Sequence, residues 1–168
     1  MLTVHLYEDG KGLCLIEDGT LASAWPGLAG RSIWVDVENP TDAEIRDLAD
    51  VCGFHHLTVE DALTPVQLPK VEEFAGYLFL LFRGLRPTEE GLELEGYKLA
   101  AYLGPGFLVT IHRRPVGACR EVSKLVLERD LPMESQMDRV LHALVDRMMD
   151  EILPILDRSE ERLEEIEE

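Results

Sequence analysis

The sequence lacks any apolar run long enough to cross a membrane. A spanning helix needs about 20 consecutive apolar residues, whereas runs such as Leu78–Phe82 have the length of a strand. The N-terminus also lacks the basic segment, apolar stretch and small-residue cleavage site of a secretory signal. We therefore expect these 168 residues to lie in the cytoplasm and to contain no membrane-spanning segment.

Cysteine is scarce. Cys14, Cys52 and Cys119 are widely spaced, and no two of them form a C-x-x-C pair. An odd number without that spacing argues against a disulfide framework and against a thiolate zinc site. We expect all three to be reduced and partly buried among apolar side chains.

Basic residues are few relative to acidic ones. Sixteen Lys and Arg against 33 Asp and Glu give a formal net charge of -17. This charge repels a phosphate backbone and excludes nucleic acid as an expected partner, while cations and basic partners stay open. Catalytic signatures are missing too, because the sequence has no nucleophile elbow, phosphate-binding loop, dinucleotide motif or matched Cys–His pair. We expect that the chain is not an enzyme.

The apolar residues that are present, 46% of the chain, suffice for a core and follow strand and helix periods. Strands are predicted at residues 2–7, 13–16, 33–37, 77–82, 93–103 and 107–112, the last three as an antiparallel sheet. Helices are predicted after Thr41, from near Thr58, over 116–129 and from about Glu134 to the end. Thr41 and Glu44 have the spacing of a capping box, and Gly53 is placed to end the first helix.

Prolines set the predicted interruptions. Pro65 and Pro69 predict an irregular connection after the second helix, and Leu131-Pro132 predicts a break before the long one. Pro154 predicts a bend that directs the final turns away from the body. The long helix reaches Glu168 without a stop signal, so we expect residues 1–132 to form an α/β domain and 133–168 to begin a long helix that continues further.

Two carboxylates, Glu60 and Asp61, are predicted in the first turn of the second helix. They offer the hard oxygen ligands that Mg²⁺ or Ca²⁺ uses, but capping and compensation of the helix dipole are the alternative that the spacing alone favours. His56 lies four residues before Glu60 and could add a transition-metal ligand, although no third ligand follows at a recognisable spacing.

A second polar series lies on the long helix. Asp138, His142, Asp146 and Asp150 follow one another at intervals of four and therefore share one face. This face could bind a divalent cation through carboxylate oxygens and an imidazole nitrogen, or it could simply be solvated.

Several segments, taken in order, resemble the CorA family of magnesium and cobalt channels. They are Trp34–Thr41, Gly53–Ala62, Pro69–Phe74, Tyr77–Leu80, Phe107–Arg113 and Ala143–Asp146. The resemblance implies an α/β fold, a mixed β-sheet layered between helices and followed by a long C-terminal stalk helix. It also implies a pentamer at the cytoplasmic face of the membrane, attached through later membrane helices. The Gly-Met-Asn tripeptide and the pore helices of the family are absent here, so these residues alone are not expected to transport an ion. Without the pore helices and the stalk partner they are expected to be monomeric or weakly associated.

The resemblance further implies that Mg²⁺, with Co²⁺ or Zn²⁺ as alternatives, is both the transported and the regulatory ion. The family's sensing carboxylate matches Asp61, with Glu60 beside it, and its partner on the stalk would follow Glu168. A second family acid falls at His142, with Asp138 and Asp146 one turn away on either side.

Departures from the family pattern keep other functions open. His56 stands where the family usually has Pro, and Leu68 where Arg usually precedes Pro69, so a zinc-transporting relative is an alternative. A stand-alone acidic protein-binding module is another, and a metal-dependent hydrolase is a third that would need a complete ligand cluster within one chain.

Overall fold

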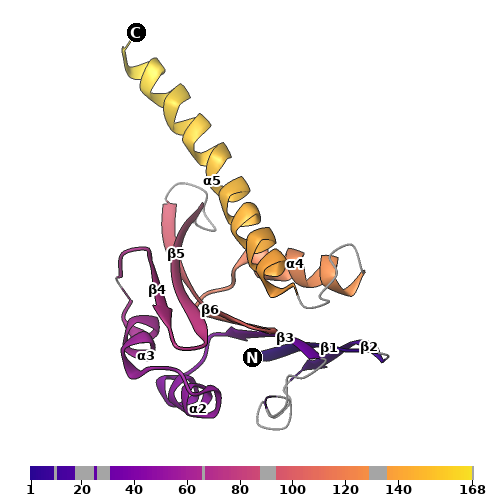
Figure 1. The fold of residues 1–168 in the computed structure, drawn as a ribbon. Coiled ribbons are helices and arrows are strands. Elements are labelled where there is room, and N and C mark those ends of the chain that lie inside the picture. Colours follow the sequence, from indigo (N-terminus) through magenta and orange to yellow (C-terminus); the bar gives the residue numbers. More distant parts are fainter. Residues whose placement is uncertain are drawn as a thin grey trace.

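A seven-stranded mixed sheet forms the centre of the molecule. The computed structural model describes residues 1–9, 11–17, 25, 31–65, 67–87, 94–128 and 136–167, with side chains up to residue 157. The strand order is β2-β1-β3-β7-β6-β5-β4. Helices cover the sheet and a long C-terminal helix extends from it (Figure 1). The predicted α/β class with a mixed, layered sheet is therefore confirmed.

The strands follow the predicted order along the chain. They are β1 (Leu2–Glu8), β2 (Gly12–Glu17), β3 (Arg31–Glu38), β4 (Lys70–Phe74), β5 (Tyr77–Pro87), β6 (Leu94–Gly104) and β7 (Phe107–His112). β3 and β7 pair in parallel, with Trp34 opposite Leu108 and Asp36 opposite Thr110. Every other neighbouring pair is antiparallel, which confirms the predicted N-terminal hairpin and the antiparallel pairing of β5, β6 and β7.

β4 was not predicted. The described residues of the connection after the second helix, up to Pro69, are irregular as predicted. The connection then leads into this edge strand, which pairs with β5 alone. Exposed and half-buried residues alternate along β4. Because an edge strand has one neighbour and one solvated side, its charged sequence carries only a weak strand signal.

Helix α2 (Asp42–Cys52) begins and ends as the sequence predicts. The amide of Glu44 donates to Thr41 Oγ1 (3.2 Å), and the amide of Thr41 donates to Glu44 Oε2 (2.7 Å). Gly53 has a φ of 71° and ends the helix in the left-handed conformation that glycine adopts without strain.

Helix α3 (His56–Leu63) begins two residues earlier than predicted. His55 is its N-cap, and His55 Nδ1 accepts a hydrogen bond from the amide of Leu57 (3.3 Å). A histidine cap is not among the usual N-cap residues, which explains why the start was misplaced. Glu60 and Asp61 consequently lie in the second turn, not in the first, and compensation of the helix dipole does not explain them.

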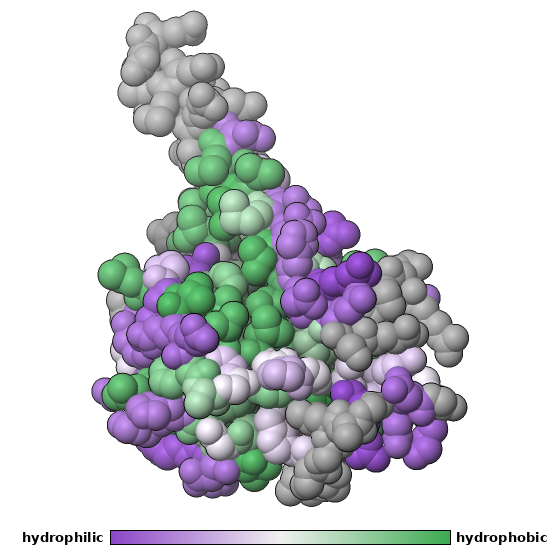
Figure 2. All heavy atoms as spheres, in the orientation of Figure 1, coloured by the Kyte–Doolittle hydropathy of each residue, from purple (hydrophilic) through white to green (hydrophobic). Residues whose placement is uncertain are grey.

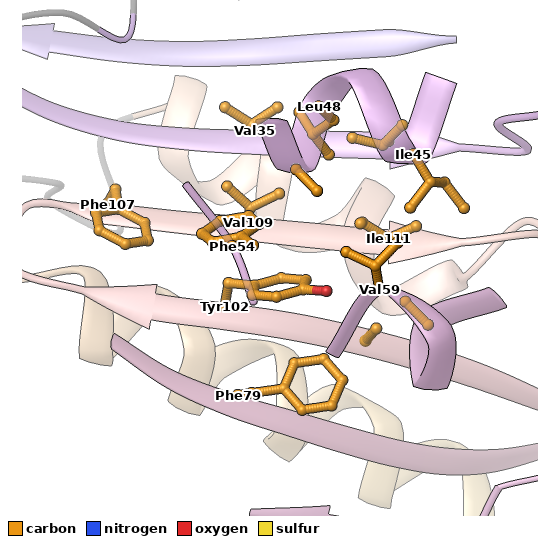
Figure 3. Close-up of a cluster of buried hydrophobic side chains, with 14 of the residues drawn as sticks. Val35, Ile45, Leu48, Phe54, Val59, Phe79, Tyr102, Phe107, Val109 and Ile111 are labelled. Carbon is orange, nitrogen blue, oxygen red and sulfur yellow. The ribbon is translucent and has the colours of Figure 1, made fainter. Parts of the chain in front are cut away.

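Helices α2 and α3 pack on one face of the sheet. Their inward residues Ile45, Leu48 and Val59 join Val35 and Val109 of the sheet in one buried cluster. Phe54, between the helices, and Tyr102 of β6 are both part of this cluster (Figure 3). Their rings stack, with centroids 3.9 Å apart. This packing fixes α3 against the sheet.

Helices α4 (Gly117–Leu127) and α5 (Met137–Glu167) pack on the opposite face, around Trp34, Leu108 and Leu144. α5 continues through Pro154 as one helix, and its last turns lie away from the sheet (Figure 1). The predicted helix start at Glu134 and the break at residues 131–132 lie outside the described residues. None of the helices in the described part of the chain is both long and apolar enough to cross a membrane.

Candidate metal centre

The carboxylate of Asp61 is held by two side chains from the segment that follows α3. It forms an ion pair with the ammonium of Lys70 in β4, and Gln67 Nε2 donates to its Oδ1. The Asp61 side chain is only 13% exposed, and Lys70 is also 3.1 Å from Glu72 Oε2. The hydrogen bond to Asp61 raises the pKa of Lys70. Within one chain, therefore, the negative charge of Asp61 already has a cationic partner.

Lys98 fixes the end of the helix that carries Asp61. Its Nζ donates to the backbone carbonyls of Asp61 (2.7 Å), Ala62 (2.8 Å) and Thr64. A cation at a helix C-terminus satisfies carbonyls that have no partner within the helix. Burial is the main cause that lowers the pKa of Lys98, to about 8. Because Lys98 lies on β6, it ties the position of Asp61 to an inner strand of the sheet.

Glu60 faces a different environment from its neighbour. It is exposed and lines a groove of about 560 Å³ whose wall also includes His56 of α3 and Asp42 and Asp50 of α2. Asp42 forms an ion pair with Arg113. The groove thus presents several carboxylates, of the hard-oxygen type that Mg²⁺ prefers.

The polar residues predicted on one face of α5 do not form a complete metal site. Asp138, His142 and Asp146 are all exposed on α5, and Asp150 lies 3.4 Å from Arg147 Nη1. α5 and α3 pack on opposite faces of the sheet, so the two predicted groups of one chain cannot share an ion. Among the described residues, neither α3 nor α5 gathers three metal-ligating side chains closely enough to hold one.

Comparison with known proteins identifies the family. The sequence profile described as "CorA-like Mg2+ transporter protein" matches residues 29–168. The chain belongs to this family. It is 30% identical to YfjQ of Bacillus subtilis over 135 residues, which are 80% of the chain and 41% of YfjQ. It is 29% identical over 136 residues to the magnesium transporter ALR1 of Saccharomyces cerevisiae, covering 80% of the chain and 16% of ALR1.

The CorA-like fold is also found in solved structures. The soluble domain of CorA from Methanocaldococcus jannaschii superposes with a TM-score of 0.73 at 19% identity, covering 99% of this chain and 63% of that one. The cytoplasmic domain of ZntB from Vibrio parahaemolyticus gives a TM-score of 0.69 at 17% identity, covering 98% and 64%. The chain spans about two fifths of YfjQ, so the CorA-like sequence here corresponds to one part of such a relative.

Sequence reasoning missed the side chains that surround Asp61 in this CorA-like domain. Gln67 and Lys70 lie six and nine residues after it, beyond the end of α3. Lys98 lies on β6, two strands after β4. The only sign of an ion-pair partner in the sequence was a lysine close to two acids in Lys70–Glu73. Nothing in the local sequence indicates that this lysine contacts α3. The three cysteines are free as predicted, although Cys14 is exposed and only Cys52 and Cys119 are buried or half-buried.

Proposed function

We propose that this chain is the cytoplasmic, cation-responsive domain of a CorA-like transporter of divalent cations. Mg²⁺ is the proposed transported and regulatory ion, with Co²⁺ and Zn²⁺ as alternatives. The family match over residues 29–168 supports a transporter. The long α5, which leaves the body of the domain (Figure 1), supports its continuation toward membrane helices at the cytoplasmic face.

The proposed sensor lies between subunits of a pentamer. Glu60 and Asp61 of one subunit supply carboxylates, and the neighbouring subunit completes the coordination. The carboxylates of Glu60, Asp42 and Asp50 around one groove are the observation that carries this proposal, because Mg²⁺ favours about six oxygen ligands. A bridging dication would stabilise the closed assembly, and loss of the ion would leave like charges facing one another.

Lys70 acts in this proposal as a competitor of the ion. Its ammonium occupies the Asp61 carboxylate in the single chain. A dication must displace it, so the strength of this ion pair sets the Mg²⁺ concentration at which the sensor fills. The ion pair is partly exposed, which keeps it weak enough for exchange.

The test uses the full-length transporter in liposomes, with flux measured against internal Mg²⁺. Asp61→Ala should close only at higher Mg²⁺, because a ligand is lost, whereas Lys70→Met should close at lower Mg²⁺, because the competing cation is gone. Asp47→Ala, at an exposed position on α2, is the control and should close at the wild-type concentration. If the first two variants also close there, Asp61 is not part of the sensor.

A further inference from the structure

Three potential metal ligands meet on the face of the sheet that α4 and α5 cover. They are Asp36 of β3, His112 at the end of β7 and Cys119 of α4, and their ligand atoms all lie within 4.8 Å of one another. The parallel register of β3 and β7 places Asp36 opposite Thr110, two residues before His112. The strand alternation therefore directs Asp36 and His112 to the same face, where Cys119 is buried.

The hydrogen bonds of His112 require that its Nε2, which faces Asp36, binds a proton or a metal ion. His112 Nδ1 is 2.6 Å from the carbonyl oxygen of Arg114, so this nitrogen carries a proton and donates it. His112 Nε2 lies 3.2 and 3.3 Å from the two carboxylate oxygens of Asp36. A carboxylate only accepts, so two lone pairs would oppose each other unless Nε2 binds a proton or a metal ion.

The distances suit a metal ion. Zinc binds nitrogen and oxygen ligands at about 2.0–2.2 Å in a tetrahedron, which places two such ligands roughly 3.3 Å apart. The observed separation of Nε2 and Asp36 Oδ1, 3.2 Å, is close to that value. Without metal, the hydrogen bond to Asp36 and its charge outweigh burial and raise the pKa of His112, so a proton fills the same place.

Outer contacts orient these side chains as they do in metal sites. The Nδ1–carbonyl contact of His112 leaves Nε2 for the ion. Thr110 Oγ1 donates to Asp36 Oδ1 (2.5 Å), and Trp34 Nε1 donates to Thr110 Oγ1 (3.0 Å). The Asp36 side chain is 15% exposed while that of His112 is 1% exposed, so Asp36 is the ligand that meets solvent.

We propose that Asp36, His112 and Cys119 bind one Zn²⁺ or Co²⁺ ion, with water at the fourth position. A thiolate, an imidazole and a carboxylate together suit these borderline-soft cations and not Mg²⁺. The site lies across the sheet from Asp61, so it is independent of the proposed magnesium sensor. It would join β3 and β7 to α4, against which α5 packs.

Binding must release two protons, the thiol proton of Cys119 and the proton that occupies His112 Nε2 when no metal is bound. Burial, and then the charge of Asp36, raise the pKa of this thiol, so the metal competes with a firmly held proton. Affinity for the metal should therefore increase with pH.

The test is a titration of the metal-free 168-residue chain with Co²⁺, followed by absorbance. One equivalent should produce a thiolate-to-cobalt charge-transfer band, and one equivalent of Zn²⁺ should abolish it. This band identifies sulfur ligation, so binding at His55 and His56 would not imitate it. Absence of the band in the wild-type chain overturns the proposal.

Two cysteine variants make the assignment specific. Cys119→Ser should lose the band and should no longer gain thermal stability from Zn²⁺, while Cys14→Ser, at the exposed cysteine, should keep both. Circular dichroism checks that each variant is folded, and Cys119→Ala provides a second replacement. A band that persists in folded Cys119→Ser or Cys119→Ala, or that disappears in Cys14→Ser, would exclude Cys119 as the ligand.

Discussion

Two histidines are buried on the same face of the sheet, and their surroundings shift their pKa values in opposite directions. His112 is paired with Asp36, which raises its pKa. His5 stacks on Trp34 with ring centroids 4.5 Å apart, and its Nε2 lies 2.7 Å from Ser123 Oγ. Burial lowers the pKa of His5 from 6.5 to about 4, despite the opposing charge of Asp36. His5 is therefore neutral at neutral pH.

Acid should consequently destabilise the fold through His5. Between pH 6.5 and about 4 the unfolded chain binds a proton at His5 that the folded chain does not, so stability falls as pH falls. The full effect is about 3 kcal/mol. Urea unfolding of the metal-free chain across this range should show a shallower pH dependence for His5→Gln. The exposed His142 provides the control, since His142→Gln should retain the wild-type slope. Equal slopes for all three proteins would contradict the assignment.

At the scale of elements, two glycines of the β5–β6 pair differ in the side chain that lies against them. A Cβ on Gly84 would overlap the ring of Tyr97, whereas one on Gly96 would lie 3.2 Å from Nη2 at the end of the Arg83 side chain. The hydroxyl of Tyr97 donates to Glu151 Oε2 of α5 (2.7 Å). Gly84 therefore makes room for the ring that connects the sheet to the long helix.

Gly84→Ala should destabilise the fold by about 1–3 kcal/mol, because the tyrosine must move out of a packed site. It should also break the bond to Glu151. Gly96→Ala should cost much less, since only a flexible side chain has to move. Urea unfolding measures both free energies, and near-ultraviolet circular dichroism should report a changed tyrosine environment in Gly84→Ala alone. Equal stabilities of the two variants would show that the ring is not confined there.

The elements that the sequence predicts correctly are those with strong local signals. Thr41, Glu44 and Gly53 define α2 by capping chemistry, and apolar runs bounded by turns define β5 and β7. β4 and the start of α3 were missed because pairing to β5 and a histidine cap determine them. Their local sequence is ambiguous.

The candidate site residues can also be divided into those that local sequence indicates and those that depend on contacts between distant segments. Glu60 and Asp61 can be selected from residue type and resemblance, but the lysine that pairs with Asp61 depends on the β4–β5 hairpin folding back beside α3. The Asp36, His112 and Cys119 group depends on a parallel strand pairing and on α4. Residues so far apart in the sequence meet only through topology. Whether Glu60, Asp61, Asp138, His142 and Asp146 bind metal stays a prediction.

At the scale of the whole molecule, a large negative charge and an apolar helix face act against each other. The formal net charge is -17. Met149, Leu153 and Leu156 are nevertheless more than half exposed on α5 and, at i, i+4 and i+7, share one face. Figure 2 shows apolar surface where this helix leaves the body. Such a face favours packing of α5 against other helices, while the acidic charge opposes close approach of identical chains.

We therefore expect the chain to be monomeric or weakly associated without divalent ions, and to associate when Mg²⁺ is added. Light scattering should show a larger mass in MgCl₂ than in NaCl of equal ionic strength, because a dication bridges carboxylates as well as screening them. Leu156→Gln should reduce this association by removing part of the α5 face. Leu127→Gln, at an exposed position on α4, should not. Equal masses in the two salts would mean that Mg²⁺ acts on this chain only as a screening ion. Equal association of the two leucine variants would instead locate the contact away from the exposed face of α5.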